Sequence, residues 1–221
     1  FCSIDADSII EDNALLRVVK PFMERPTETV AAGGIVRIVN GCEVREGRVV
    51  KIELPDRPIP IFQVVEYLRA FLTGRVGWSV LQSLLIISGA FGIFRKDVVV
   101  AAGGYRTDTV GEDMELVLRM RRYKAERKEA YEVTYIPDPL CWTEVPSDLR
   151  SMRKQRTRWT RGLIESLWTH RKLLFNRNYK RLGLLGYPYW LFFEWLSPLI
   201  AFAGMVYTLF LALTGALNWP F

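Results

Sequence analysis

The chain has 221 residues, of which 50% are hydrophobic and 24% are charged, and its formal net charge is +6. This composition excludes a collagen-like chain, a low-complexity filament and an intrinsically disordered protein. Three widely spaced cysteines also exclude a small disulfide-stapled scaffold. The remaining classes are a basic soluble domain, a nucleic-acid binder, and a soluble domain joined to a membrane segment.

Residues 1–149 show the mixture of short apolar runs and amphipathic segments that is typical of an α/β domain. The predicted elements, in chain order, are a strand at residues 1–4, a helix at 12–24 that Pro21 interrupts, a strand at 35–39, a hairpin within 41–54, a helix at 62–72, a helix at 112–122, and a strand at 133–136 ended by Pro137 and Pro139. Because the chain opens on Phe1 within a strand-like run, we expect it to be a piece of a longer protein.

Residues 150–181 are strongly basic, with eleven Lys and Arg residues against a single acid, Glu165. Apolar residues recur at helical spacing within this block, at Trp159, Leu163, Leu167 and Leu174. For residues 150–182 we predict a basic amphipathic helix region that lies on a membrane surface, where Lys and Arg mark the cytoplasmic side and attract anionic headgroups. A nucleic-acid-binding helix needs the same charges and is the alternative. We expect no nucleic-acid partner, because the apolar segment that follows accounts for the position of the charges.

Residues 183–221 form the apolar end of the chain. Between residues 183 and 217 the single charged residue is Glu194, and residues 195–217 carry no charge. Since about 20 apolar residues cross a bilayer core, the pattern predicts a transmembrane helix at 195–217. Trp190, Trp195 and Trp219 lie near its ends, as interfacial aromatic residues do. The alternative is a buried core helix.

Two acids follow the first predicted strand. Asp5 and Asp7 alternate along the chain, so their carboxylates can face the same side. Two carboxylates bind a hard divalent cation through oxygen, and such a cation can bridge diphosphate oxygens. The alternative is a pair of solvated loop acids. The single histidine, His170, lies in the basic block, and no His/Cys cluster has the spacing of a zinc site.

Glu112 and Asp113 open a predicted helix after Gly111. Acids in a first helical turn are commonly capping residues that the helix dipole stabilises, and the motif alone favours that interpretation. The alternative is a general base, which must reach a substrate hydroxyl and works best when burial raises its pKa.

Gln155, Arg158 and Trp159 fall on one face of the predicted basic helix. Arginine suits phosphate recognition through its planar fork, and tryptophan offers a flat platform for a sugar ring. An interfacial helix with snorkelling arginines and an anchoring tryptophan accounts for the same pattern. Gly89 lies in the small-residue segment Ser-Gly-Ala-Phe-Gly, where the backbone either approaches a ligand closely or makes a tight turn.

The order of these motifs is more specific than any one of them. Asp-Ala-Asp, Ser-Gly-Ala-Phe-Gly, Gly-Glu-Asp and Gln-Arg-Thr-Arg-Trp, followed by an apolar span, resemble the membrane-bound family 2 glycosyltransferases, such as cellulose, hyaluronan, chitin and poly-N-acetylglucosamine synthases. The resemblance implies an α/β fold: part of a GT-A domain, a Rossmann-like mixed sheet between helices, over residues 1–149. An amphipathic interface helix and a transmembrane helix would follow.

The resemblance also assigns roles to the site residues. Asp5 and Asp7 would hold the nucleotide diphosphate with its Mg²⁺ or Mn²⁺. Asp113 would be the general base, with Glu112 beside it on the substrate side.

The same resemblance places the basic motif and the glycine segment around the substrates. Gln155, Arg158 and Trp159 would close the site over diphosphate and acceptor, and Gly89 would line the acceptor side.

The implied reaction is an inverting transfer of a sugar from a nucleotide-sugar, expected to be a UDP-sugar, to a growing polysaccharide. The alternative is transfer to a lipid acceptor, as in glycolipid or ceramide-type glucosyltransferases. The complete protein is expected to be a multi-pass protein of the plasma membrane, with its catalytic domain in the cytoplasm and the lipid bilayer as a partner.

Overall fold

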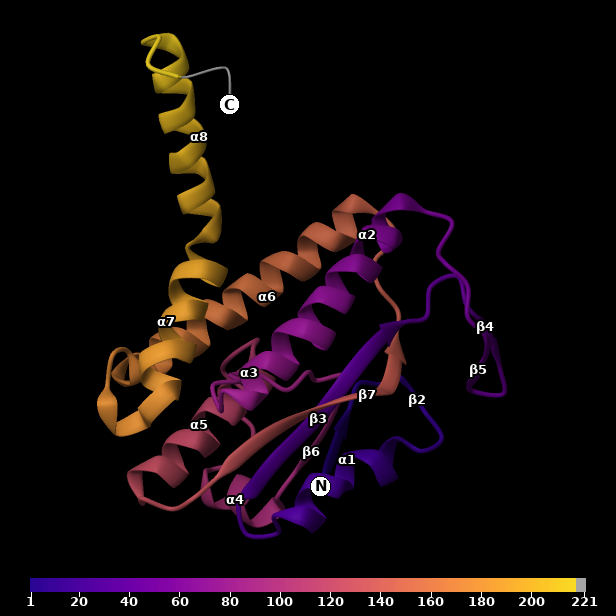
Figure 1. Cartoon of the computed structure of the whole chain (residues 1–221). Coiled ribbons are helices and arrows are strands. Elements are labelled where there is room, and N and C mark those ends of the chain that lie inside the picture. The colour runs from indigo at the N-terminus through magenta and orange to yellow at the C-terminus, as the bar shows by residue number, and fades with distance from the viewer. Residues whose placement is uncertain (218–221) are drawn as a thin grey trace.

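The computed structural model describes residues 1–217, which form one five-stranded sheet with helices around it and a separate two-stranded hairpin (Figure 1). The strand order is β1-β6-β3-β7-β2. The strands are β1 (Cys2–Ile4), β6 (Phe91–Phe94), β3 (Thr29–Ile38), β7 (Glu132–Thr143) and β2 (Ile9–Ile10). The predicted α/β class with a mixed sheet is confirmed.

The pairing directions bring several strand ends to one edge of the sheet. Strand β1 pairs antiparallel with β6, β6 pairs antiparallel with β3, and β3 pairs parallel with β7. Strands β1, β3 and β7 therefore run the same way and end at the same edge. Strand β3 is the buried centre of the sheet, with one exposed residue, Arg37, near its end. Because both faces of β3 are buried, its sequence is a continuous run of apolar residues and glycines and does not alternate between apolar and polar residues.

Strand β7 continues through Pro137 and Pro139, so the prediction that these prolines end it is wrong. Gly34 of β3 pairs with Ile136, whereas the next residue, Ile35, pairs with Pro139. Residues of β7 therefore bulge out of register at the prolines. A bulge tolerates proline because the missing backbone N–H is not needed for the ladder there.

The predicted hairpin is confirmed as β4 (Glu43–Arg45) and β5 (Arg48–Lys51), which pair antiparallel. Glu46 and Gly47 connect the strands with φ angles of 50° and 74°. Two positive φ angles are typical of the two-residue turn whose twist matches that of paired strands.

The first helices differ from the prediction in their continuity and length. Helix α1 (Ala14–Glu24) is not interrupted at Pro21 and continues to its predicted end. The helix predicted at 62–72 is the middle of a longer helical stretch made of α2 (Pro58–Tyr67), a π-helical segment (Leu68–Arg75) and α3 (Val76–Val80). Pro58 suits the first position of a helix, where no backbone N–H is needed. These helices pack against β3 and β7.

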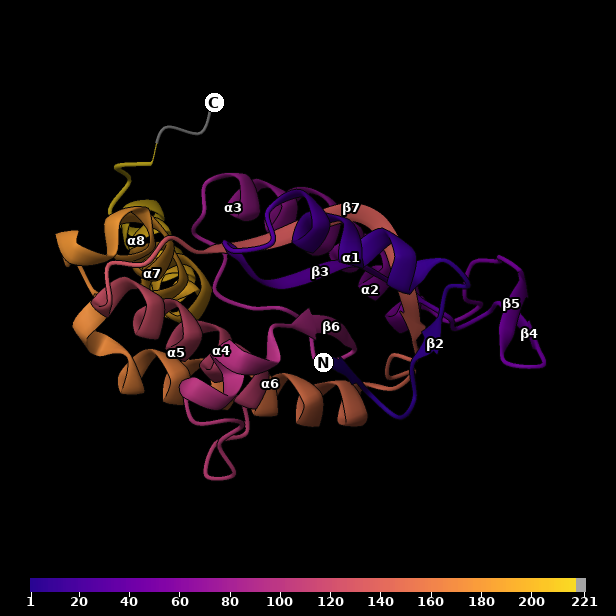
Figure 2. The same ribbon diagram turned by 90° about the horizontal axis from the view of Figure 1, so that it is seen from below.

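Helix α5 (Glu112–Glu126) is buried on two faces, which fixes its orientation. Leu116 and Val117 belong to the sheet core, together with α4 (Lys96–Ala101), and Leu118 belongs to a second apolar cluster. That cluster joins α5 to α6 (Leu149–Thr169), and Figure 2 shows the two helices side by side.

The basic block is not one helix, so the prediction for residues 150–182 needs correction. Helix α6 starts after Asp148, whose carboxylate caps it by accepting a 2.9 Å hydrogen bond from the backbone N–H of Ser151. It ends at Thr169, and short 3₁₀ turns follow at Arg171–Leu173 and Arg177–Tyr179. Leu173 and Tyr179 are buried in the second cluster, so packing against α5 turns the chain back.

The helix predicted at 195–217 is shorter in the structure, as α8 (Ser197–Leu213), and is joined to the preceding helical stretch by a bend. Within residues 1–217 no single helix is long and apolar enough to cross a bilayer. The helical stretch Leu182–Trp195, which includes α7 (Tyr187–Tyr189), and helix α8 (Ser197–Leu213) meet that requirement together but are bent by 54°. Pro198 lies in the first turn of α8, where it cannot continue a preceding helix. Trp219 lies outside the described residues.

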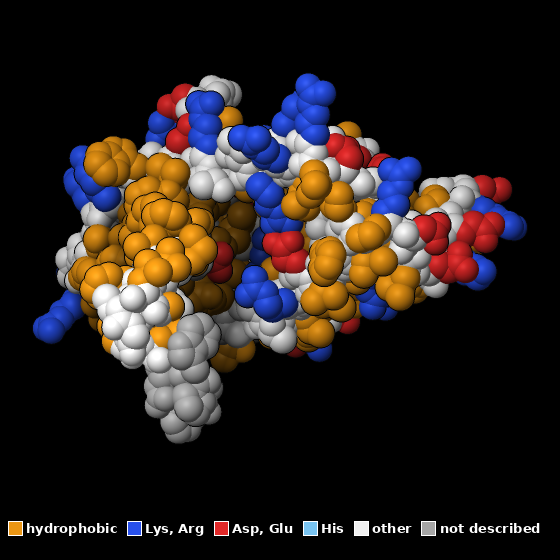
Figure 3. All heavy atoms as spheres, turned by 90° about the horizontal axis from the view of Figure 1, so that it is seen from above, with side chains coloured by type: hydrophobic (Ala, Val, Ile, Leu, Met, Phe, Trp, Pro, Cys, Tyr) orange, Lys and Arg blue, Asp and Glu red, His pale blue; other side chains and the backbone are white. Residues whose placement is uncertain are grey.

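Helix α8 exposes its apolar side chains on all sides and buries none of them. Figure 1 shows α8 projecting from the domain, and Figure 3 shows hydrophobic side chains gathered at that end of the molecule.

Candidate active site

The candidate site begins at the end of β1, where Asp5 and Asp7 follow the strand. The backbone N–H of Ser8 donates a 3.1 Å hydrogen bond to the carbonyl oxygen of Asp5 and closes a turn there. Both acids are accessible to solvent. Because β1, β3 and β7 end at the same edge, these carboxylates lie at the carboxyl edge of the sheet, where open α/β sheets bind their ligands.

Gly89 lies between the two acidic motifs. Its backbone N–H donates a 3.2 Å hydrogen bond to Oδ2 of Asp113. A Cβ atom built at Gly89 would lie 3.4 Å from Oδ1 of Asp5. The backbone of Gly89 therefore binds the carboxylate of Asp113 and faces that of Asp5, and a larger side chain at this position would enter the space between them.

Asp113 occupies the first turn of α5. Its Oδ1 accepts a 2.7 Å hydrogen bond from the backbone N–H of the next residue, Met114, whereas the N-cap is Gly111 and no side chain caps the helix. The residue keeps some solvent exposure, but protein atoms surround its carboxylate. This burial raises the pKa of Asp113, and the nearby charge of Glu112 adds to the rise, whereas the Met114 hydrogen bond and the charge of Arg75 oppose it. Capping does not require such enclosure, but a general base benefits from it.

Arg158 approaches the acidic cluster from α6. Burial raises the pKa of Asp5, and the charges of Asp7 and Glu112 raise it further, whereas the charge of Arg158 lowers it. Groups that shift one another's pKa in this way lie within electrostatic reach. The structure thus brings together predicted site residues from the end of β1, the start of α5 and the middle of α6.

The other two residues of the predicted basic motif have different surroundings. Trp159 is 40% exposed, and its ring centroid lies 4.7 Å from the guanidinium carbon of Arg156. Arg156 also forms a bidentate salt bridge with Glu66 of α2. Gln155 has a buried side-chain oxygen with no hydrogen-bond partner among residues 1–217. Neither Gln155 nor Trp159 hydrogen-bonds to the acidic cluster within those residues, so their substrate roles stay predictions.

Helix α6 also holds the loop that leads into Asp113. Gly111 and Gly162 touch through their backbones, since a Cβ atom on Gly162 would lie 2.8 Å from the Cα of Gly111. Oε2 of Glu165 accepts hydrogen bonds from the Thr109 hydroxyl at 2.9 Å and from the Val110 backbone N–H at 3.1 Å. Sequence reasoning missed this clamp, although Glu165 was conspicuous as the single acid of the basic block.

A buried ionic network lies deeper along the same helix pair and was also missed. Nε2 of His170 lies 3.2 Å from Oε1 of Glu115, and both side chains are 1% exposed. Burial pushes the pKa of Glu115 upward, but hydrogen bonds with His170 and Arg119 leave it below its ordinary value. Breaking a buried pair of this kind leaves an uncompensated charge. The sequence gives no signal for this pair, because the pair depends on how closely the end of α6 packs against α5.

Replacing Glu165 by Gln tests the clamp. The pKa of Glu165 is lowered by hydrogen bonds with Arg161, Val110 and Thr109, so the charged form stabilises the loop above the ordinary pKa and this contribution is lost as pH falls through the lowered pKa. We expect E165Q to speed hydrogen exchange at the Val110 amide several-fold at neutral pH, because a neutral acceptor binds this N–H more weakly.

The matched control for this prediction is R161Q. It removes the ion pair of Glu165 on α6 but leaves both hydrogen bonds to the loop, so Val110 should keep most of its protection. Equal loss of protection in both variants would show that the ion pair, and not the clamp, orders the loop.

Comparison with known proteins adds to this geometry. The family model described as Glycosyl transferase family group 2 matches residues 1–221. A poly-beta-1,6-N-acetyl-D-glucosamine synthase from Staphylococcus epidermidis is 27% identical over 170 residues, which cover 75% of this chain and 36% of that protein. The synthase of Staphylococcus aureus strain COL is 27% identical over 164 residues, covering 74% of this chain and 35% of its own length. This chain thus spans about a third of these relatives.

The same fold occurs in a solved structure. A mannosyltransferase from Pyrobaculum calidifontis, in complex with GDP-Man and Mn²⁺, matches 99% of this chain and 56% of its own chain with a TM-score of 0.52 and 19% sequence identity. The expected GT-A arrangement of a mixed sheet between helices is confirmed by this likeness.

Proposed function

Since the chain belongs to the glycosyl transferase family group 2 and so is part of a glycosyltransferase, we propose that it carries the catalytic acids of an inverting sugar transfer. The donor is a nucleotide-sugar, with a UDP-sugar expected, and the acceptor is a growing polysaccharide. The observation that carries this proposal is the enclosed carboxylate of Asp113, which Gly89 joins to Asp5. Relatives named as polysaccharide synthases favour the polymeric acceptor.

Asp113 accepts the proton of the acceptor hydroxyl as that oxygen attacks the anomeric carbon. Its raised pKa makes its carboxylate a stronger base than that of an ordinary aspartate. The hydrogen bonds from Gly89 and Met114 hold the carboxylate in one orientation. Arg158, whose charge lowers the pKa of Asp5, would offset the negative charge of a departing diphosphate.

The acids at the end of β1 fit a divalent cation. Within the described residues no three potential ligands gather into a metal cluster. Mg²⁺ and similar ions commonly take one or two carboxylates and fill their other positions with substrate phosphates and water. Asp5 and Asp7 supply two carboxylates. Burial is the largest cause of the raised pKa of Asp5, and repulsion from Asp7 is the next largest. Asp5 and Asp7 would therefore hold Mg²⁺ or Mn²⁺, which when bound neutralises charge on the diphosphate.

Metal removal tests this part of the proposal on the complete protein. Chelation with EDTA should lower transfer more than 100-fold, because a metal contributes several kcal/mol to stabilising the leaving charge. Added Mn²⁺ or Mg²⁺ should restore the rate, measured as released nucleoside diphosphate across a panel of nucleotide-sugars.

The Asp7→Asn variant should need at least about tenfold more metal for half-maximal rate, since one of two carboxylates is lost. Asp12→Asn is the matched control, because Asp12 is an exposed neighbour that pairs with Arg48. Transfer that continues undiminished in EDTA would refute the metal assignment.

We further propose that the protein works at the cytoplasmic face of the plasma membrane. The support is the exposed apolar surface of α8 beside the basic segment that begins with α6. The reaction product identifies the acceptor. A polymer detected by size-exclusion chromatography supports a polysaccharide acceptor, and a lipid carrying a single sugar on thin-layer chromatography supports the alternative lipid acceptor.

A further inference from the structure

A cavity of about 550 Å³ lies at the opposite edge of the sheet from the acidic cluster. Glu28, just before β3, and Tyr131, just before β7, are on its wall. These residues precede the starts of two parallel strands, whereas Asp5 follows the end of β1, which runs in the same direction. The cavity is therefore separate from the candidate active site, and what it binds does not depend on the proposed function.

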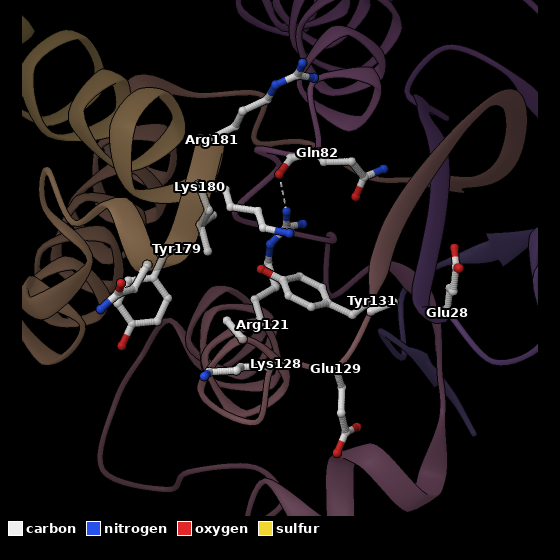
Figure 4. A pocket seen from close by; sticks show the side chains of 13 residues that line it. Glu28, Gln82, Arg121, Lys128, Glu129, Tyr131, Tyr179, Lys180 and Arg181 are labelled. Carbon is white, nitrogen blue, oxygen red and sulfur yellow. Dashed lines mark hydrogen bonds between the residues drawn. The ribbon is translucent and has the colours of Figure 1, made fainter.

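Arg121 of α5 is the most unusual side chain of this cavity, because it is charged and only 1% exposed. One of its terminal nitrogens, Nη2, donates to the backbone carbonyl oxygen of Gln82, as the dashed line in Figure 4 marks. Its Nε and Nη1 are buried and have no hydrogen-bond partner among residues 1–217. Burying a charge with free donors is costly unless another group satisfies them.

Tyr131, the aromatic neighbour of Arg121, offsets this burial only in part, because the pKa of Arg121 stays below its ordinary value. The guanidinium carbon lies 5.3 Å from the ring centroid of Tyr131, which is a cation–π contact with the ring face. Burial lowers the pKa of Arg121, and Tyr131 and the charge of Glu132 oppose that shift without overcoming it. The guanidinium thus lies in a site that still disfavours its charge unless a further negative group binds there.

The rest of the cavity lining is also rich in cations. Figure 4 shows Lys180 extending into the same pocket as Arg121. Lys128 and Arg181 belong to the lining too, against the carboxylates of Glu28 and Glu129. Glu129 is already paired with Lys124. The unpaired charge around the cavity is therefore positive, and the cations that face one another repel unless an anion lies between them.

The shape and position of the cavity narrow the class of anion. The planar fork of arginine matches a phosphate group, and lysine binds phosphate as a point charge. A cavity of this volume has room for a phosphate with further atoms attached. Residues 180 and 181 also directly precede the apolar stretch Leu182–Trp195.

We propose that this cavity is a second ligand site, which binds the phosphate group of a small anion between Arg121 and Lys180. The phosphate comes either from a lipid headgroup or from a soluble phosphate ester, and the chemistry at the two side chains is the same.

Thermal unfolding of the complete protein in neutral detergent tests the proposal, with inorganic phosphate and glycerol 3-phosphate as probes and chloride at equal ionic strength as the reference. Both probes should raise Tm. Lys180→Gln should raise the probe concentration that gives half of the full Tm increase about tenfold, and Arg121→Met should abolish the Tm increase. Arg177→Gln is the matched control, because the side chain of Arg177 is exposed and is not among those that line the cavity.

Nanodiscs distinguish the two sources of phosphate. A higher Tm in phosphatidylglycerol than in phosphatidylcholine nanodiscs, lost in Lys180→Gln, identifies a lipid headgroup, and equal Tm values with a response to glycerol 3-phosphate identify a soluble ester. If Arg121→Met does not fold, Lys180→Gln still decides the test. Absence of any phosphate response, or an equal loss in Arg177→Gln, would overturn the proposal.

Discussion

The Asp113→Asn variant of the complete enzyme is expected to bind the nucleotide-sugar donor normally and to transfer sugar about 10²–10⁴-fold more slowly. Asparagine keeps the shape of the side chain, so Gly89 and Met114 still surround it, but it cannot accept the acceptor proton. Transfer is measured by product formation, and donor binding is measured separately by titration calorimetry.

Two controls accompany this variant. Asp108→Asn lies in the loop before α5, where Asp108 is exposed and pairs with Arg106, and it should transfer at the original rate. The Tm of Asp113→Asn is measured too, because asparagine removes a charge from an enclosed site but can accept only one of the two hydrogen bonds that the carboxylate accepts from Gly89 and Met114. Transfer near the original rate in Asp113→Asn would refute the assignment of the base.

The pH dependence of transfer follows from the same residue. Only the ionised carboxylate can accept a proton, so kcat should fall as pH decreases through the pKa of Asp113, at a higher pH than for an ordinary aspartate. The effect on stability has the opposite sign. The folded state binds this proton more tightly than the unfolded state, so the stabilisation is complete below the ordinary pKa and is lost as pH rises through the raised pKa.

Gly162→Ala is expected to destabilise the protein by about 1–3 kcal/mol, which is the usual cost of forcing atoms into a packed contact. The new methyl group would lie 2.8 Å from the Cα of Gly111 and 2.9 Å from its backbone nitrogen. Backbone atoms cannot move aside as a flexible side chain can, so α5 and α6 must separate. Asp113 lies two residues beyond Gly111, and a displacement of about 1 Å there can lower kcat up to about 100-fold.

Gly77→Ala is the matched control for this substitution. Gly77 is also a helical glycine, but a Cβ atom there meets nothing within 4 Å. Alanine should stabilise that position by about 0.5–1 kcal/mol through its helix propensity. Denaturant unfolding and kcat are measured on both variants. Equal stability of Gly162→Ala and the original protein would show that the two helices are not locked by this contact.

Several features followed from local sequence alone. The hairpin within residues 41–54, the helix after Gly111 and the strand before Asp5 depend on neighbours in the chain, and the structure has them where they were predicted. The continuation of β7 through Pro137 was not predictable in this way, because it depends on a register shift against β3. The bend before α8 has a local signal in Pro198, which the prediction of one helix over residues 195–217 did not use.

The sequence by itself determined which chemical groups are present, their order along the chain and the elements that carry the acids, because strand ends and helix starts are local properties. Only the tertiary structure decided which groups meet. The contact of Gly89 with Asp5 and Asp113, the Glu165 clamp on Val110 and the partly unpartnered Arg121 all join segments that are distant in the chain. Such contacts depend on long-range packing, and the residue pattern of one segment contains no record of what lies against it.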